Sequence, residues 1–139
     1  MKGLDTNVLV RYLVGDEPAQ ERAALRFIEL ATERGEAMLV NALVLCELVW
    51  VLRSSYGYSK DDVAAVVEKI LSAEQFEVED VDAAWLALGD FRNGRADYAD
   101  CLIGRRNARL GCETTATFDG RLKSIPGFDL LPHATRPGS

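Results

Sequence analysis

Histidine and cysteine are the scarcest chemically reactive residues of this sequence. Its 139 residues include a single histidine, His133, so no pair of histidines can act as general acid and base. The three cysteines, Cys46, Cys101 and Cys112, are an odd number, and the first two fall in apolar helical patterns. We expect reduced thiols rather than a disulfide framework or a zinc site, which favours a cytoplasmic protein.

Long apolar runs are also missing. The longest, residues 37–52, is interrupted by Asn41 and Glu47, and Asp5 stands where a signal peptide would need its apolar core. We therefore expect neither a membrane span nor a signal peptide. The apolar fraction of 48% is enough for a real core, so we expect one domain over residues 1–133 and a frayed tail at residues 134–139.

Positive charge is in deficit. The net charge of −6 weighs against binding to nucleic acid, because phosphate affinity comes mainly from lysine and arginine. Bound divalent ions would reduce this objection by cancelling negative charge. The basic residues also cluster in two places: Arg105, Arg106 and Arg109, then Arg121 and Lys123. These clusters fit either a solvated surface or a guide for phosphates.

Short apolar segments alternate with helical patterns along the chain. The patterns predict strands at residues 2–5, 38–40, 75–78, 113–116 and 130–131. They predict helices at residues 8–14, 19–34, 42–55, 81–92 and 97–110, and one more that begins at Ser59 and includes Leu71. Strands separated by helices indicate a parallel sheet covered on both faces, a three-layer α/β/α sandwich.

The most informative feature is a set of acidic residues that stand in apolar sequence: Asp5, Glu47, Asp97, Asp100 and Asp119. A carboxylate beside a buried strand is costly unless a cation neutralises it, and no obvious side chain does so here. Asp5 ends the first predicted strand and Asp119 comes after the fourth, at the sheet edge where such folds bind ligands. Carboxylates sharing one pocket indicate a site for Mg²⁺ or Mn²⁺.

Each acid also has a structural interpretation. Asp97 can cap a helix with Asp100 in its first turn, and Asp119 can be a turn residue before Gly120. Asp5 can cap the short helix after it. Glu47 can pair with an arginine, and its apolar neighbours predict that it points inward or along a rim.

Four sequence stretches carry a resemblance to a known family. They are GLDTNVL at residues 3–9, LCEL at residues 45–48, DYADCLI at residues 97–103 and TATFD at residues 115–119. In this order and spacing they resemble the motifs of PIN-domain ribonucleases of the VapC toxin type, over residues 3–131. The resemblance implies an α/β fold, a three-layer α/β/α sandwich with a short, mainly parallel central sheet.

The resemblance also implies metal-dependent hydrolysis of RNA phosphodiester bonds, with Mg²⁺ or Mn²⁺ as cofactor. The implied catalytic and metal-binding acids are Asp5, Glu47, Asp100 and Asp119, with Asp97 as an additional candidate ligand. Side chains that would orient these carboxylates or touch the substrate are Thr6, Asn7, Asp97 and Thr117. The implied partners are RNA, a cognate antitoxin and a second copy of the chain, with no membrane. The apolar residues of the first helix and of the helix from Ser59 are candidate antitoxin surfaces.

Two other functions fit parts of the sequence. A phosphatase of the haloacid-dehalogenase type would use Asp5 as nucleophile, but it expects a second aspartate where this chain has Asn7. A non-catalytic PIN-like binding module would keep the same acids for structural reasons.

Overall fold

The computed structural model describes residues 1–133, so the predicted tail at residues 134–139 lies outside the described residues. The helices are α1 (Thr6–Leu13), α2 (Pro18–Glu33), α3 (Ala42–Ser54), α4 (Lys60–Ser72), α5 (Val81–Asn93), α6 (Tyr98–Arg109) and the short 3₁₀ helix η1 (Gly120–Leu122). The strands are β1 (Lys2–Gly3), β2 (Met38–Val40), β3 (Phe76–Val78), β4 (Thr115–Thr117) and β5 (Phe128–Leu130). The predicted α/β class is confirmed. Among residues 1–133, no helix has the length and apolar character needed to span a bilayer.

The helix starts depend on capping residues that the sequence makes visible. The Asn41 side chain accepts a hydrogen bond from the Val44 backbone N–H at 2.9 Å, and Ser59 accepts one from Asp62 at 3.1 Å. Pro18 occupies the first turn of α2, where its missing N–H costs nothing. The predicted starts of α2, α3 and α4 are therefore confirmed.

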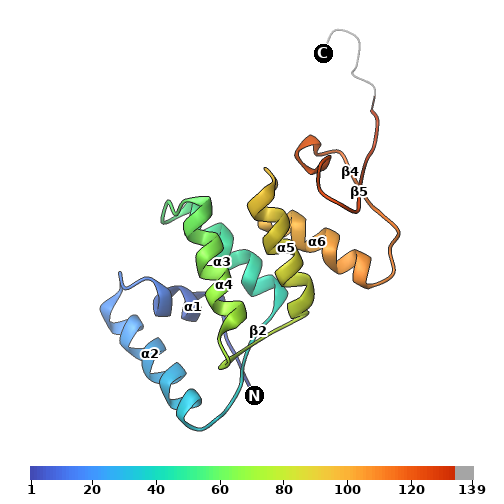
Figure 1. Cartoon of the computed structure of the whole chain (residues 1–139). Helices are drawn as coiled ribbons and strands as arrows, with labels where there is room; N and C mark the ends of the chain where they lie inside the picture. Colours follow the sequence, from blue (N-terminus) through green and yellow to red (C-terminus); the bar gives the residue numbers. More distant parts are fainter. Residues whose placement is uncertain (134–139) are drawn as a thin grey trace.

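All strand pairs are parallel, but the strands divide into two sheets. One has the order β1-β2-β3 and the other pairs β4 with β5. Lys2 lies opposite Met38, and Thr115 lies opposite Phe128. Figure 1 shows α1 and α2 at the left, α3 to α6 in the centre, and β4 and β5 at the upper right, away from the end labelled N. The single central sheet expected from the sequence is thus split.

The start of α6 is fixed by a buried tyrosine. Tyr98 is fully buried, donates its hydroxyl to the Ala84 carbonyl of α5 at 3.0 Å, and packs edge-on against Phe91. Nearly all of the buried apolar side chains of the described residues form one core cluster, which includes Tyr98. Because Asp97 precedes Tyr98 and Asp100 follows two residues after it, this packing fixes the first turn of α6, from which both carboxylates project.

We call residues 115–130, which carry β4, η1 and β5, the C-terminal unit. Its Leu122 and Ile125 are 3% and 5% exposed and belong to the core cluster, and Ile125 lies against Gly94 at the end of α5. The C-terminal unit also places the Phe128 ring against Gly104 of α6, so closely that a Cβ at Gly104 would lie 2.6 Å from the ring. Gly104 therefore lets the C-terminal unit approach α6.

Replacing Gly104 by alanine tests this contact. The added methyl group clashes with the Phe128 ring, so we expect the free energy of unfolding to fall by about 1–3 kcal/mol. Gly89→Ala is the matched control, because a Cβ at Gly89 of α5 meets no atom within 4 Å. That control should be stabilised by about 0.5–1 kcal/mol through helix propensity. Urea unfolding measures both, and equal stabilities would contradict the contact.

Candidate active site

Three of the predicted acids converge on the guanidinium of Arg121. Arg121 bonds Asp119 with an N–O distance of 2.7 Å, and it lies 3.8 Å from Asp97 and 3.9 Å from Asp100. Asp97 and Asp100 stand at the start of α6, and Asp119 lies just beyond the end of β4. The predicted meeting of the third and fourth motifs is therefore present in the structure.

Arg121 is the residue whose role the sequence reasoning missed. The sequence shows no obvious side-chain cation for these acids and predicts Arg121 in a surface or phosphate-guiding cluster. In the structure its side chain and backbone N–H both bond the Asp119 carboxylate. The signal was present in the spacing, since Arg121 comes directly after the Asp119-Gly120 turn.

The surroundings move the pKa values of two acids in opposite directions. The hydrogen bonds from Arg121 hold the pKa of Asp119 below its ordinary value. Burial raises the pKa of Asp100, the charge of Asp97 adds to the rise, and Arg121 opposes it. Asp100 is therefore an acid whose charge the metal-free protein only partly balances.

Arg121→Gln should raise the pKa of Asp119 toward that of an ordinary aspartate. A lowered pKa stabilises the fold above the unfolded-state pKa of about 3.9, and this contribution is lost as the pH falls through the folded-state value. The variant should therefore unfold more easily than the wild type at neutral pH, with a difference that shrinks in acid. NMR titration of the Asp119 carboxyl measures the pKa, with the exposed Asp129 as internal control. An unchanged Asp119 pKa would contradict this account.

Asp5 and Glu47 lie in different surroundings. The Asp5 carboxylate caps α1 by accepting the Thr6 backbone N–H at 2.8 Å, so its capping interpretation is confirmed. Glu47 is exposed on α3, so an inward orientation is wrong. Within residues 1–133 neither acid forms an ion pair. The acids are also less buried than we expected, because Asp97 is exposed as well.

The predicted capping role of Asp97 and the predicted turn role of Asp119 compare differently with the structure. Asp97 occupies the N-cap position of α6 but makes no side-chain capping hydrogen bond. Asp119 precedes η1 and accepts the Arg121 N–H at 2.9 Å, as a turn residue does. A role at the turn does not prevent ligation, because each carboxylate has several lone pairs.

The smaller polar side chains predicted to orient the acids differ in their contacts with them. The Thr117 hydroxyl accepts the Asp119 backbone N–H at 3.0 Å and thereby holds the backbone of that residue. The Thr6 hydroxyl is buried and has no hydrogen-bond partner among the described residues. Asn7 is exposed beside it.

The donor chemistry suits a hard divalent cation, because the acids supply oxygen ligands alone. The geometry within one chain does not complete such a site. Among residues 1–133, no group of three or more histidine, cysteine, aspartate or glutamate side chains is placed to hold a metal ion. Asp5 lies between β1 and α1, whereas Asp100 and Asp119 belong to the cluster around Arg121.

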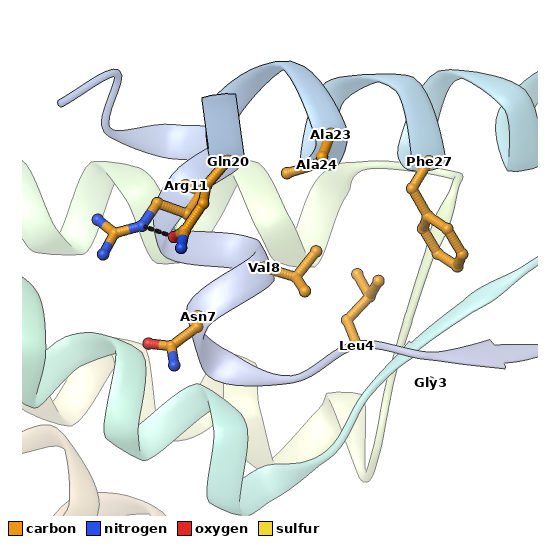
Figure 2. Close-up of a pocket in the computed structure, with 9 residues that line it drawn as sticks. All are labelled: Gly3, Leu4, Asn7, Val8, Arg11, Gln20, Ala23, Ala24 and Phe27. Carbon is orange, nitrogen blue, oxygen red and sulfur yellow. Dashed lines mark hydrogen bonds between the residues drawn. The ribbon is translucent and has the colours of Figure 1, made fainter. Parts of the chain in front are cut away.

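A groove of about 440 Å³ lies between α1, α2 and the end of β1 (Figure 2). Its lining is mainly apolar, with Leu4, Val8 and Phe27 pointing into it. At one end, the Arg11 guanidinium donates to the Gln20 side chain at 2.7 Å. The groove involves the first helix, one of the two surfaces that the sequence marked for an antitoxin.

The arginines that come after Asp100 are bound to carboxylates. Arg105 forms two hydrogen bonds with Asp90, at 2.7 and 2.9 Å, and Arg109 bonds Asp80 at 2.6 Å. Arg106 lies 4.0 Å from Asp80. These contacts tie α6 to α5 and to the turn before it. Arg105 therefore has a structural role, whereas Arg106 and Arg109 pair with acids at the surface, which fits the interpretation as a solvated cluster.

The cysteines are free thiols, as predicted: Cys46, Cys101 and Cys112. Burial raises the pKa of Cys101 to about 12, so its thiol is unreactive at neutral pH.

Comparison with known proteins agrees with the sequence motifs. The family model of the PIN domain matches residues 3–127. A curated protein of Aquifex aeolicus (strain VF5), named VapC ribonuclease, is 33% identical over 128 residues, which cover 92% of this chain and 93% of that protein. No solved structure matches the chain significantly.

Proposed function

Because the chain belongs to the PIN-domain family, we propose that it is a metal-dependent endoribonuclease and the toxin of a toxin–antitoxin pair. The observation that carries the proposal is the convergence of Asp97, Asp100 and Asp119 at the meeting point of α6 and β4. These acids come from two of the four motifs, and the similarity to a VapC ribonuclease extends along nearly the whole chain.

The proposed catalytic acids and cation ligands are Asp5, Glu47, Asp100 and Asp119, with Asp97 as a further candidate ligand. A bound Mg²⁺ or Mn²⁺ would polarise the scissile phosphate and lower the pKa of an attacking water. The task of the chain's own residues is to hold and orient these charges. Thr117 does so for Asp119 through its hydrogen bond, and Thr6 and Asn7 are proposed to do so beside Asp5.

The proposed partners depend on the same family membership. We propose that the groove between α1 and α2 receives part of an antitoxin, because its lining is mainly apolar and includes Leu4, the residue before Asp5. We also expect a homodimer. The proposed RNA substrate and the three free thiols are consistent with a reducing, cytoplasmic setting.

A non-catalytic binding module is the second candidate. It is favoured by one observation, the absence of a complete three-ligand metal group within residues 1–133. A phosphatase that uses Asp5 as nucleophile would instead leave a phosphoaspartate at that residue.

Substrate selection separates these functions. The purified protein, shown by mass spectrometry to carry no antitoxin, is incubated in Mg²⁺ buffer with labelled RNA, DNA of the same sequence and a phosphate monoester. We expect internal cleavage of RNA alone. RNA that is bound but never cut would favour the binding module, and monoester hydrolysis with phosphorylated Asp5 would favour the phosphatase.

A further inference from the structure

A second pocket lies between α3, α5 and the start of α6, three helices that Figure 1 shows together in the centre of the molecule. Trp50 and Arg53 line it from α3, Phe91 from α5 and Asp97 from the start of α6. Its volume is about 340 Å³, at the lower end of the range for small-ligand sites. A pocket of this size suits one flat ring system better than a partner's helix, which is about 10–12 Å across.

The pocket shares a residue with the candidate active site. Asp97 lines the pocket and also lies 3.8 Å from Arg121, within the acid cluster. Glu47 precedes Trp50 by three positions of α3 and both are exposed, so their side chains project from the same side of that helix. A molecule held at Trp50 would therefore lie close to acids from two of the four motifs.

Trp50 is the largest side chain of α3, and it is left in solvent. It is 68% exposed, whereas Leu48 and Leu52 of the same helix are fully buried. Its backbone carbonyl accepts the Ser54 hydroxyl at 2.6 Å within α3, so the indole is presented by a helix rather than by a loop. An aromatic face on such a support is the surface on which proteins that bind single-stranded nucleic acid stack bases.

Arg53 places a positive charge beside Trp50. It comes three positions after Trp50 on α3, lines the same pocket and is exposed. Within residues 1–133 it forms no ion pair, in contrast to Arg105 and Arg109. A guanidinium group matches the geometry of a phosphate and can bind it through two hydrogen bonds. Trp50 and Arg53 together offer a face for a base and a charge for a phosphate.

We propose that this pocket is a base subsite, in which Trp50 stacks on one unpaired nucleobase of the RNA and Arg53 binds the adjoining phosphate. The assignment rests on the proposed nuclease function and names its substrate class: RNA with an unpaired nucleotide beside the cleaved bond, in a single strand or a loop. A base inside a duplex has both faces covered by its neighbours and cannot enter. Because every base has an aromatic face, the stacking selects an unpaired nucleotide rather than a sequence.

The two tryptophans of the chain allow a direct test. In Trp85→Phe chains Trp50 is the only tryptophan, and in the matched control, Trp50→Phe, only Trp85 of α5 remains. Each antitoxin-free protein is mixed in Mg²⁺ buffer with single-stranded RNA of mixed sequence, or with the same RNA annealed to its complement. Stopped-flow fluorescence records the emission, and cleavage is measured in the same mixtures. We expect the single strand to quench Trp50 before cleavage, the duplex to leave it unchanged, and Trp85 to respond to neither.

The contrary results are distinct. Cleavage of the single strand without any change in Trp50 emission, or equal quenching by the duplex, would overturn the subsite and leave the nuclease standing. A wild type that neither binds nor cuts RNA would refute the nuclease and the subsite with it. Trp50 emission that depends on protein concentration and does not respond to RNA would show that a second copy covers the pocket, which also overturns the subsite.

Cleavage kinetics measure how much the stacking contributes. Trp50→Ala should raise KM about 5- to 150-fold with kcat unchanged, because stacking is equally strong before and during the reaction. Trp50→Phe should restore most of the loss, since it keeps an aromatic face. A fall in kcat at unchanged KM would contradict a role in binding the base.

The salt dependence of RNA binding tests Arg53. In Arg53→Gln, the slope of log binding constant against log salt concentration should be shallower by about 0.7, the loss of one phosphate contact on a single strand. Arg34→Gln is the matched control, because Arg34 is exposed at the end of α2, outside the pocket, and should keep the wild-type slope. Equal slopes in all three proteins would overturn the phosphate contact.

Discussion

We expect replacement of Asp100 by asparagine to lower the rate of RNA cleavage by at least about 100-fold, more than is usual for residues that only support a metal ligand. The carboxylate lies at the start of α6, half-buried and 3.9 Å from Arg121, where it is proposed to hold the cation. Asparagine keeps the shape of the side chain but removes its charge. Single-turnover cleavage of a labelled RNA measures the loss. Asp129→Asn, an exposed acid on β5, is the matched control and should keep the wild-type rate.

The same substitution should leave the fold intact. Burial and the neighbouring acids raise the pKa of Asp100, so its charged form destabilises the native state at neutral pH. Asp100→Asn should therefore unfold at the same temperature as the wild type or a higher one at pH 7. The difference should vanish below the ordinary aspartate pKa, where the carboxyl is protonated in both states. A variant that loses activity only because it unfolds would refute the assigned role.

We expect Mn²⁺ to raise the melting temperature of the metal-free protein by roughly 5–10 °C at 100-fold excess over the dissociation constant. A cation that binds only the folded state stabilises it by about 2.7 kcal/mol under these conditions. EDTA should reverse the shift, and Asp100→Asn should abolish it. Differential scanning calorimetry measures the shift, with Asp129→Asn again as control.

A shift of equal size in Asp100→Asn would place the cation elsewhere. No shift in the wild type, at concentrations that support cleavage, would show that the ion binds only together with RNA.

The local structure was predictable because its causes are local. Asn41 and Ser59 cap their helices through hydrogen bonds to residues three positions later, and Pro18 starts α2. The partners of the strands were not predictable in the same way. A strand of two or three residues, such as β1 or β4, makes few hydrogen bonds, so tertiary packing decides which edge it joins. The sequence therefore predicted parallel strands but not their division into two sheets.

The candidate site shows the same limit. The acids at the start of α6 and just after β4, Asp97, Asp100 and Asp119, could be predicted from the sequence because the motifs that contain them have a specific order and spacing. The ion pairs that surround them depend on distances between elements. Arg121 meets Asp97 and Asp100 across more than 20 positions of sequence, and Arg105 meets Asp90 on another helix. No periodicity in the sequence predicts those ion pairs.

The most direct test is the rate of RNA cleavage by the wild type, stripped with EDTA and then titrated with Mn²⁺. We predict no cleavage without the cation and a saturable rise as it is added. Cleavage at the same rate in EDTA would contradict a site in which carboxylates act through a metal ion.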